Sequence, residues 1–241
     1  MNTHQKQLLN SALRLNIELD SVQLGRFQCY LDELVDWNGR VNLTAITDCH
    51  EVQIKHFLDS LTVAAALPAP PADGYRIIDV GSGAGFPGLP LKIAFPQIEM
   101  TLLEATGKKC AFLRHISTML GLNVNIINMR AEEAAHLPEY RGQFDTATAR
   151  GLASMAALAE LTLPFLRMGG LLVAQKKGAL ADELKGSERA LKILGGAPYE
   201  VHPLALPEFP DGRCLVIVKK IAPTPENFPR RSGLPSKKPL T

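Results

Sequence analysis

The sequence has little of what marks a metal-binding, secreted or membrane-spanning protein. Its 241 residues include four cysteines, with no CxxC pair and no histidine at metal-ligand spacing, which indicates reduced thiols and no metal. The amino terminus lacks the basic, then apolar, then small-residue order of a secretory signal. The most apolar long window, residues 151–174, contains Glu160, Pro164 and Arg167 and is unsuited to a bilayer. We therefore expect a cytoplasmic protein that does not enter a membrane.

Net charge is also small, but the charge is unevenly distributed. The formal net charge is +2, whereas residues 214–241 hold six basic side chains against the single acid Glu226, a balance of +5. The other 213 residues carry 20 basic and 23 acidic side chains, a balance of −3. A basic end on a mildly acidic body favours a polyanionic partner. A tail kept basic only for solubility is the alternative on charge alone.

Apolar residues at helical spacing characterise residues 5–67. Within this part, the apolar stripe over residues 24–35 predicts a helix. Asp20 or Ser21 is the expected cap at its start, and Gly39 is the expected stop.

The Pro-rich segment 68–74 then interrupts the chain and is the expected boundary after the helical part. We predict three regions on this basis. They are a helical amino-terminal extension over residues 1–67, a ligand-binding domain over residues 75–220, and a basic, Pro-rich tail over residues 221–241.

Strand patterns alternate with helical patterns through the central region. The expected strands are residues 75–80, 99–104, 123–128, 144–149, 170–175, 199–204 and 213–220. Such alternation predicts an α/β fold with a mostly parallel sheet. The last two strands have no helix between them, so we expect an antiparallel hairpin at one edge. Seven strands ending in a hairpin is the arrangement of Rossmann-like methyltransferases, which favours that class by analogy.

A glycine-rich loop follows the first expected strand. Gly81, Gly83 and Gly85 allow the backbone to adopt positive φ and to approach a ligand closely. The helix expected after the loop offers unpaired N–H groups to an anionic group. The loop therefore predicts a nucleotide site, with a purely structural turn as the alternative.

Two acidic residues bear on which nucleotide is bound. Asp79 precedes Gly81 by two residues, where it would repel the pyrophosphate of a dinucleotide. S-adenosylmethionine has no phosphate and carries an ammonium and a sulfonium, which a carboxylate attracts. Glu104 ends the second expected strand and would accept hydrogen bonds from ribose hydroxyls in either class of ligand. Asp79 therefore favours the methyl donor.

Further candidates follow the third and fourth expected strands, because ligands lie at the carboxyl ends of strands in an open α/β sheet. The backbone of Ala131 and the side chain of Glu132 could hold the adenine, and Phe86 could lie against the donor. A core aromatic and an acid that favours a helix start are the alternatives for Phe86 and Glu132.

The segment after the fourth strand is informative about the acceptor. Residues 148–152 read Thr-Ala-Arg-Gly-Leu, without the Asn/Asp-Pro-Pro-aromatic sequence of many amine methyltransferases, and no Pro-Cys pair supplies a nucleophile. An acceptor that is already nucleophilic remains, such as guanine N7, which has no proton to lose and needs alignment rather than a general base. Arg150 could bind guanine O6 or the donor carboxylate, with a surface charge as the alternative. No catalytic residue is identified.

Three segments resemble the GidB (RsmG) family, the bacterial 16S ribosomal RNA guanine-N7 methyltransferases. They are residues 37–45 with 55–61, residues 79–88, and the tail from Phe228 to Leu240. The resemblance covers nearly the whole chain. It implies a substrate of 16S rRNA, free or within the small ribosomal subunit or its assembly intermediate, and no stable protein partner is evident.

The donor site expected from residues and resemblance together comprises Asp79, Gly81, Gly83, Gly85, Phe86, Glu104, Ala131, Glu132 and Arg150. The resemblance itself implies Gly81, Phe86, Ala131, Glu132 and, on its Ala-Arg-Gly context, Arg150. The tail is expected to dock RNA through Arg230, Arg231, Lys237 and Lys238 in a salt-dependent way. Looped or single-stranded RNA is the expected target, because a guanine edge in an A-form helix is poorly reachable.

Two other functions remain open from the residues alone. A nicotinamide-dependent oxidoreductase fits the fold class but is disfavoured by Asp79 and by the lack of a proton-relay pair. A non-catalytic RNA-binding module on a nucleotide-binding fold is disfavoured by the intact glycine-rich loop.

Overall fold

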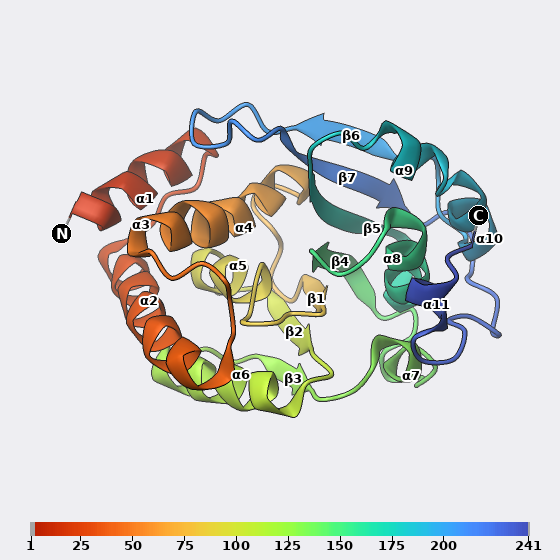
Figure 1. Cartoon of the computed structure of the whole chain (residues 1–241), viewed down its shortest axis with the longest axis horizontal. Helices are drawn as coiled ribbons and strands as arrows, with labels where there is room; N and C mark the ends of the chain where they lie inside the picture. Colours follow the sequence, from red (N-terminus) through yellow and green to blue (C-terminus); the bar gives the residue numbers. More distant parts are fainter. Residues whose placement is uncertain (1–2, 241) are drawn as a thin grey trace. The chain divides into compact units, whose positions relative to one another are not determined.

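The computed structural model describes residues 3–240, with side chains described from Gln5 onward (Figure 1). Its strands are β1 Arg76–Val80, β2 Glu99–Leu103, β3 Asn125–Ile127, β4 Phe144–Arg150, β5 Leu166–Lys177, β6 Glu200–Pro203 and β7 Arg213–Lys219. They form one sheet in the order β3-β2-β1-β4-β5-β7-β6. β7 runs antiparallel to both β5 and β6, whereas β1 with β4, β2 with β3 and β4 with β5 are parallel. The predicted α/β class, with a mostly parallel sheet and an antiparallel edge hairpin, is confirmed.

The chain divides into two compact units that are both discontinuous in sequence. The first comprises the chain up to Tyr75 together with Ser82–Asn128, and the second comprises Arg76–Gly81 together with the chain from Met129 onward. The division predicted from the sequence, with its boundary within residues 68–74, stays a prediction about domain organisation.

Most helices of the first unit precede β1. Those before it are α1 Thr3–Arg14, α2 Ser21–Val41, α3 Cys49–Val52, the π-helical η1 Gln53–Leu58, α4 Asp59–Leu61 and the 3₁₀-helical η2 Thr62–Ala66. Two more, α5 Gly88–Ala94 and α6 Gly107–Met119, follow it. α2 packs against α5 and α6 (Figure 1).

The start and end of α2 follow from its capping residues. Asp20 and Gln23 form a capping box, in which each side chain accepts the other's backbone N–H at 2.7 and 2.8 Å. The expected stop at Gly39 is wrong, because a glycine within a helix costs only about 1 kcal/mol. The helix instead continues to Val41 and is capped by Asn42, which adopts the left-handed conformation, while the Asn38 side-chain oxygen accepts the next two backbone N–H groups.

The helices of the second unit are short. They are α7 Ala131–Ala134, α8 Met155–Thr162, the 3₁₀-helical η3 Leu163–Phe165, α9 Ala181–Lys185, α10 Glu188–Leu194 and α11 Leu234–Lys237. Two short helices, α9 and α10, rather than one continuous helix cover residues 181–194. The buried Ser187 separates them and donates its hydroxyl to the Leu184 carbonyl at 2.6 Å, a side-chain bond that competes with helix continuation.

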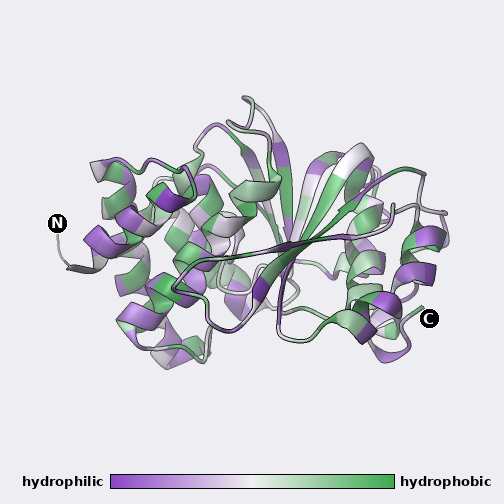
Figure 2. Ribbon diagram, turned by 90° about the horizontal axis from the view of Figure 1, so that it is seen from above, coloured by the Kyte–Doolittle hydropathy of each residue, from purple (hydrophilic) through white to green (hydrophobic). Residues whose placement is uncertain are grey.

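α8 is the central helix of the second unit. It packs against β4, β5, α7, α10 and α11, and every one of its residues is buried (Figure 1). A helix that is apolar all round belongs in a core, and α8 fits this rule except for its last residue, Thr162, and for Glu160, the one charged residue within it. Figure 2 shows hydrophobic residues concentrated in the strands, whereas the helices alternate between hydrophilic and hydrophobic residues.

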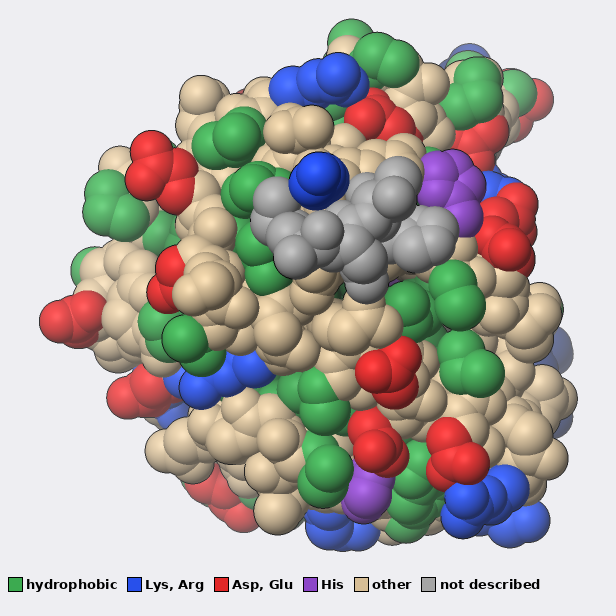
Figure 3. Space-filling model, turned by 90° about the vertical axis from the view of Figure 1, so that its left-hand side faces the viewer, with side chains coloured by type: hydrophobic (Ala, Val, Ile, Leu, Met, Phe, Trp, Pro, Cys, Tyr) green, Lys and Arg blue, Asp and Glu red, His purple; other side chains and the backbone are tan. Residues whose placement is uncertain are grey.

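The surface of the first unit carries mixed charge where its amino-terminal helices lie. Figure 3 shows acidic, basic and hydrophobic side chains interspersed over that face, with no single patch of Lys and Arg. Within residues 3–240, no helix combines the length and the apolar character needed to cross a bilayer.

Candidate functional site

Asp79 lies on β1 in the second unit, opposite Thr148 of β4 in the parallel register. Both side chains are fully buried, and the Thr148 hydroxyl donates to Asp79 Oδ1 at 3.0 Å. A buried carboxylate needs such hydrogen bonds, because burying it without them is costly. The neighbouring strand therefore fixes the orientation of the acid that the sequence predicts to favour a cationic ligand.

Gly81 is the last residue of Arg76–Gly81, the segment of the second unit that contains β1. Its backbone conformation requires a glycine. Its φ is +74°, a conformation that other residues rarely adopt. A Cβ at this position would lie 2.7 Å from Cδ1 of Leu152, a side chain that is 37% exposed and able to move. The backbone conformation, more than the space around it, accounts for the glycine.

In the first unit, Glu104 binds the part of the glycine-rich loop that follows Gly81. It is 7% exposed, its Oε2 accepts the N–H of Gly83 at 3.0 Å, and its Oε1 accepts the N–H of Thr106 at 2.7 Å. Ser82 also donates its N–H to the carbonyl of Leu103 at 3.1 Å. A carboxylate has lone pairs for further donors. Glu104 can therefore shape the loop and still accept the ribose hydroxyls predicted for it.

Gly85 is a closely surrounded glycine of the loop. Its φ is +100°, and a Cβ there would lie 2.5 Å from Leu89 Cδ1 and 2.7 Å from the Tyr30 hydroxyl. Tyr30, fully buried on α2, donates its hydroxyl to the carbonyl of Ala84. An amino-terminal helix thus contacts the loop directly, a contact that sequence reasoning missed because no local pattern links residues 30 and 84.

Phe86 lies between two other aromatic rings of the first unit. It stacks on His56 with centroids 4.5 Å apart and on Tyr30 with centroids 5.3 Å apart, at interplanar angles of 21° and 17°. Aromatic stacking contributes about 1 kcal/mol per pair beyond area burial. No role was predicted for His56, although it falls within a segment that carries the family resemblance. Contact of Phe86 with a donor stays a prediction.

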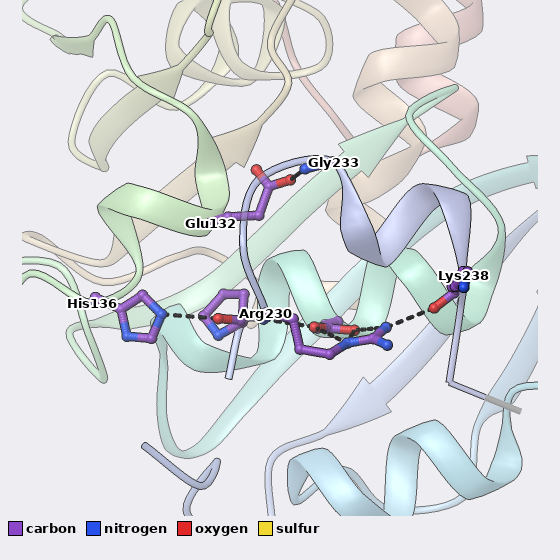
Figure 4. Close-up of polar contacts among 7 residues, drawn as sticks. Glu132, His136, Arg230, Gly233 and Lys238 are labelled. Carbon is purple, nitrogen blue, oxygen red and sulfur yellow. Dashed lines mark hydrogen bonds and ion pairs between the residues drawn. The ribbon is translucent and has the colours of Figure 1, made fainter. Parts of the chain in front are cut away.

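Glu132 lies in the second unit as the second residue of α7, directly after Ala131. It is 7% exposed, and its Oε1 accepts the backbone N–H of Gly233 at 2.7 Å (Figure 4). The acid predicted to hold adenine therefore also holds the carboxy-terminal tail. Arg150 is the last residue of β4, next to Gln175 of β5 in the parallel register, at the carboxyl end of the strand as expected.

The four basic tail residues differ in their environments. Arg230 forms an ion pair with the fully buried Glu160 of α8, with Nη2–Oε2 at 2.7 Å and Nε–Oε1 at 2.9 Å (Figure 4). The hydrogen bonds to Glu160 raise the pKa of Arg230 above its ordinary value. Arg231, Lys237 and Lys238 are exposed. The sequence does not distinguish these four residues, whereas the structure assigns Arg230 an intramolecular partner.

Other cationic and polar side chains of the second unit bind the backbone of the tail. Arg141 donates to the carbonyls of Thr224, Pro225 and Phe228 at 2.9, 3.1 and 2.9 Å, and burial lowers its pKa. The ring of His136 is 2.9 Å from the carbonyl of Pro229. These residues carry no motif, so a single sequence does not reveal them.

Lys220 is a buried cation where β7 gives way to the tail. Its Nζ donates to the carbonyls of Leu163 and Leu194 at 3.0 and 2.9 Å and to the Thr224 hydroxyl. Burial, followed by repulsion from Arg141, lowers the pKa of Lys220 to about 7. Lys220, the residue directly before the tail, therefore has a pKa near neutral.

Solved structures with low sequence identity share the fold of the chain. It is similar to a SAM-dependent O-methyltransferase from Thermotoga maritima, with a TM-score of 0.55 and 17% identity over 80% of this chain and 72% of that one. It is also similar to a precorrin-6y C5,15-methyltransferase from Geobacter metallireducens, with a TM-score of 0.51 and 15% identity over 68% of this chain and 87% of that one.

Sequence relatives are much closer. A protein of Dehalococcoides mccartyi named ribosomal RNA small subunit methyltransferase G is 51% identical over 97% of this chain and 99% of its own length. A protein of the same name from Roseiflexus castenholzii is 45% identical over 97% and 99%. The family profile described as rRNA small subunit methyltransferase G matches residues 23–208. The resemblance found in the sequence is thereby confirmed, and the chain belongs to the GidB family of rRNA small subunit methyltransferases G.

Proposed function

We propose that the protein is an enzyme that methylates guanine N7 in bacterial 16S ribosomal RNA, in the cytoplasm, with S-adenosylmethionine as the methyl donor. The similarity to proteins named ribosomal RNA small subunit methyltransferase G, over 97% of the chain, carries this proposal. The shared fold of S-adenosylmethionine-dependent methyltransferases supports the choice of cofactor.

The chemistry requires alignment rather than proton transfer. S-adenosylmethionine supplies a methyl group on a sulfonium, and guanine N7 offers a lone pair without a proton to remove. The residues of this chain therefore need only to bind the donor, exclude water and orient the base. Arg150, at the carboxyl end of β4, is the candidate that orients guanine O6 or the donor carboxylate.

The donor-binding residues proposed are Asp79, Gly81, Gly83, Gly85, Phe86, Glu104, Ala131, Glu132 and Arg150. Positive φ at all three loop glycines, of 74°, 60° and 100°, supports a close approach of backbone to ligand. Three carboxylates of this set are buried yet hydrogen-bonded, which supports fixed acceptors rather than a solvated acidic surface. The exposed Arg231, Lys237 and Lys238 are proposed to contact RNA phosphates.

Calorimetric titration with S-adenosylmethionine and with NAD tests the cofactor. Binding of the methyl donor alone supports the proposal, binding of NAD alone indicates an oxidoreductase, and binding of neither indicates an RNA-binding module without catalysis. Mass spectrometry of 16S rRNA from cells with and without the protein tests the reaction. A guanosine methylated only in the presence of the protein is expected, and identical spectra would refute the proposed activity.

A further inference from the structure

The carboxy-terminal tail reaches Glu132 through a short, well-anchored segment. Arg230 is bound to α8, and Gly233, three residues later, donates its N–H to Glu132 of α7 (Figure 4). We infer that Arg230 is a positioning residue, which holds the tail on Glu160 so that Gly233 orients the Glu132 carboxylate for the donor. This inference rests on the proposed function, in which Glu132 contacts the adenine.

The anchor is a two-pronged ion pair with an additional backbone bond. Glu160 Oε1 accepts the backbone N–H of Arg230 at 2.8 Å and its Nε at 2.9 Å, while Oε2 accepts Nη2 at 2.7 Å and Nε at 3.1 Å. Glu160 is fully buried and Arg230 is 23% exposed. Such paired geometry fixes the direction as well as the place of the guanidinium. Residue 230 is therefore held to α8 through both its backbone N–H and its guanidinium.

The guanidinium of Arg230 also binds the chain eight residues later. Nη2 of Arg230 donates to the carbonyl of Lys238 at 2.8 Å, so this side chain links the two ends of residues 230–238, the stretch that contains α11 (Figure 4). Gly233, within this stretch, has φ of +79°, and a Cβ there would meet nothing within 4 Å. The glycine is thus required by the turn that aims its N–H at Glu132, and not by crowding.

One carboxylate oxygen of Glu132 is bound by the tail. Oε1 accepts Gly233 N–H, and within residues 3–240 no hydrogen bond is made to Oε2. Oε2 can accept a hydrogen bond from the exocyclic N6 amino group of an adenine. Loss of the Gly233 contact would free the side chain to rotate, and misplacement of a binding group weakens the interaction it makes.

Arg231 is the residue with which Arg230 is compared. It is adjacent in sequence, equally charged and exposed. If the tail acted only through its positive charge, loss of either arginine would weaken RNA binding and leave donor binding intact. A positioning role predicts that only the loss of Arg230 affects the donor.

The test compares Arg230→Gln with the matched control Arg231→Gln by calorimetry with S-adenosylhomocysteine and with its inosine analogue, which lacks the N6 amino group. Arg230→Gln is expected to weaken S-adenosylhomocysteine binding about tenfold, the scale of one hydrogen bond to a charged group, and to reduce the preference for adenosine over inosine. Arg231→Gln is expected to retain both. In a Glu132→Ala background, Arg230→Gln should cause no further loss.

Each result has one meaning. Equal donor affinity and equal preference in both arginine variants overturns the inference, as does an additive loss in the Glu132→Ala background. Absence of S-adenosylhomocysteine binding in the unaltered protein refutes the proposed function as well. If thermal unfolding shows that Arg230→Gln is unfolded, Arg230→Lys replaces it, since lysine keeps the charge and loses the paired geometry. A smaller loss of the same preference then supports the inference, and an unchanged preference overturns it.

Discussion

Two glycine turns, one in each unit, make the same hydrogen bond and are stabilised in different ways. Gly83 donates its N–H to the buried Glu104 at 3.0 Å, and Gly233 donates its N–H to the buried Glu132 at 2.7 Å. The glycine and its acid are 21 residues apart in the first case and 101 in the second. A local arrangement and a long-range one thus present a carboxylate in the same manner.

The surroundings of the two turns explain the difference. The loop in the first unit is packed at Gly85 and Phe86 against Tyr30 and Leu89, whose contacts do not depend on charge. The tail in the second unit is held by Arg141 on backbone carbonyls and by the Arg230 ion pair. We therefore expect the loop to respond to changes of volume and the tail to respond to changes of charge.

The largest expected effect tests the loop by adding a methyl group. Gly85→Ala places a Cβ 2.5 Å from Leu89 and 2.7 Å from Tyr30 at a φ of +100°, and should lower the free energy of unfolding by about 4 kcal/mol. Gly233→Ala is the matched control, because its φ is +79° but its surroundings are open, and it should cost about 1 kcal/mol. Urea denaturation measures both. Equal losses would contradict the distinction between an enclosed loop and an open turn.

The next effect concerns the ion pair of the tail. Arg230→Gln leaves Glu160 without its cation in a fully buried position, and should lower the free energy of unfolding by about 3 kcal/mol. The double variant Arg230→Gln, Glu160→Gln should recover part of this loss, since it removes the unpaired buried charge. Urea denaturation of Arg230→Gln, Glu160→Gln and the double variant gives the coupling free energy between the two side chains. A loss no larger than that of Arg231→Gln would show that the pair contributes nothing.

The glycine-rich loop was predictable from the sequence because its constraints are local. Positive φ at Gly81, Gly83 and Gly85 follows from the one residue type that tolerates it, and the acid after β2 follows from the strand pattern. What the sequence could not supply was the packing of Tyr30 and the second role of Glu104 as an acceptor for Gly83. Both depend on tertiary contacts between segments that no local pattern connects.

The tail shows where prediction from one sequence fails. Arg230 and Arg231 are adjacent and of the same type, so composition and spacing assign them the same role. Their difference lies in Glu160, 70 residues away, which only the fold brings to Arg230. A buried acid in the largely apolar helix α8 was the available signal, because such an acid requires a partner.

The free energy of unfolding should depend on pH because of Lys220, a buried cation of the second unit. Burial lowers the pKa of Lys220 from 10.5 to about 7, so between these values the unfolded chain binds a proton that the folded protein has released. The free energy of unfolding should therefore rise with pH from about 7 to 10.5, with a contribution from Lys220 of up to about 1.4 kcal/mol per pH unit. Below about pH 7 both states are protonated, and this contribution is constant.

Lys220→Met isolates that contribution. The variant should show a smaller increase in stability than the unaltered protein when denaturation is followed from pH 7 to 9.5. Parallel pH profiles for the two proteins would mean that Lys220 keeps its proton throughout this range. The carbonyls of Leu163 and Leu194 would lose their donor in the variant, so its absolute stability is not the informative quantity, whereas the slope is.

The smallest effect on stability should accompany the removal of the exposed tail charges. Arg231, Lys237 and Lys238 are exposed, and changing all three to Gln should alter the free energy of unfolding by less than about 0.5 kcal/mol. RNA affinity should nonetheless fall, and the slope of log affinity against log salt should decrease by about 2, since each phosphate contact on a single strand contributes about 0.7.

The matched control removes three exposed charges elsewhere in the second unit, Lys177, Lys185 and Lys192. It changes the net charge by the same amount. Any difference in RNA affinity between the two triple variants is therefore due to the position of the charges and not to their number. Filter binding at several salt concentrations measures the slopes. If the control lowers RNA affinity and slope as much as the tail variant, the tail contacts RNA no more than the rest of the surface does. The charge asymmetry of the sequence then reflects solubility.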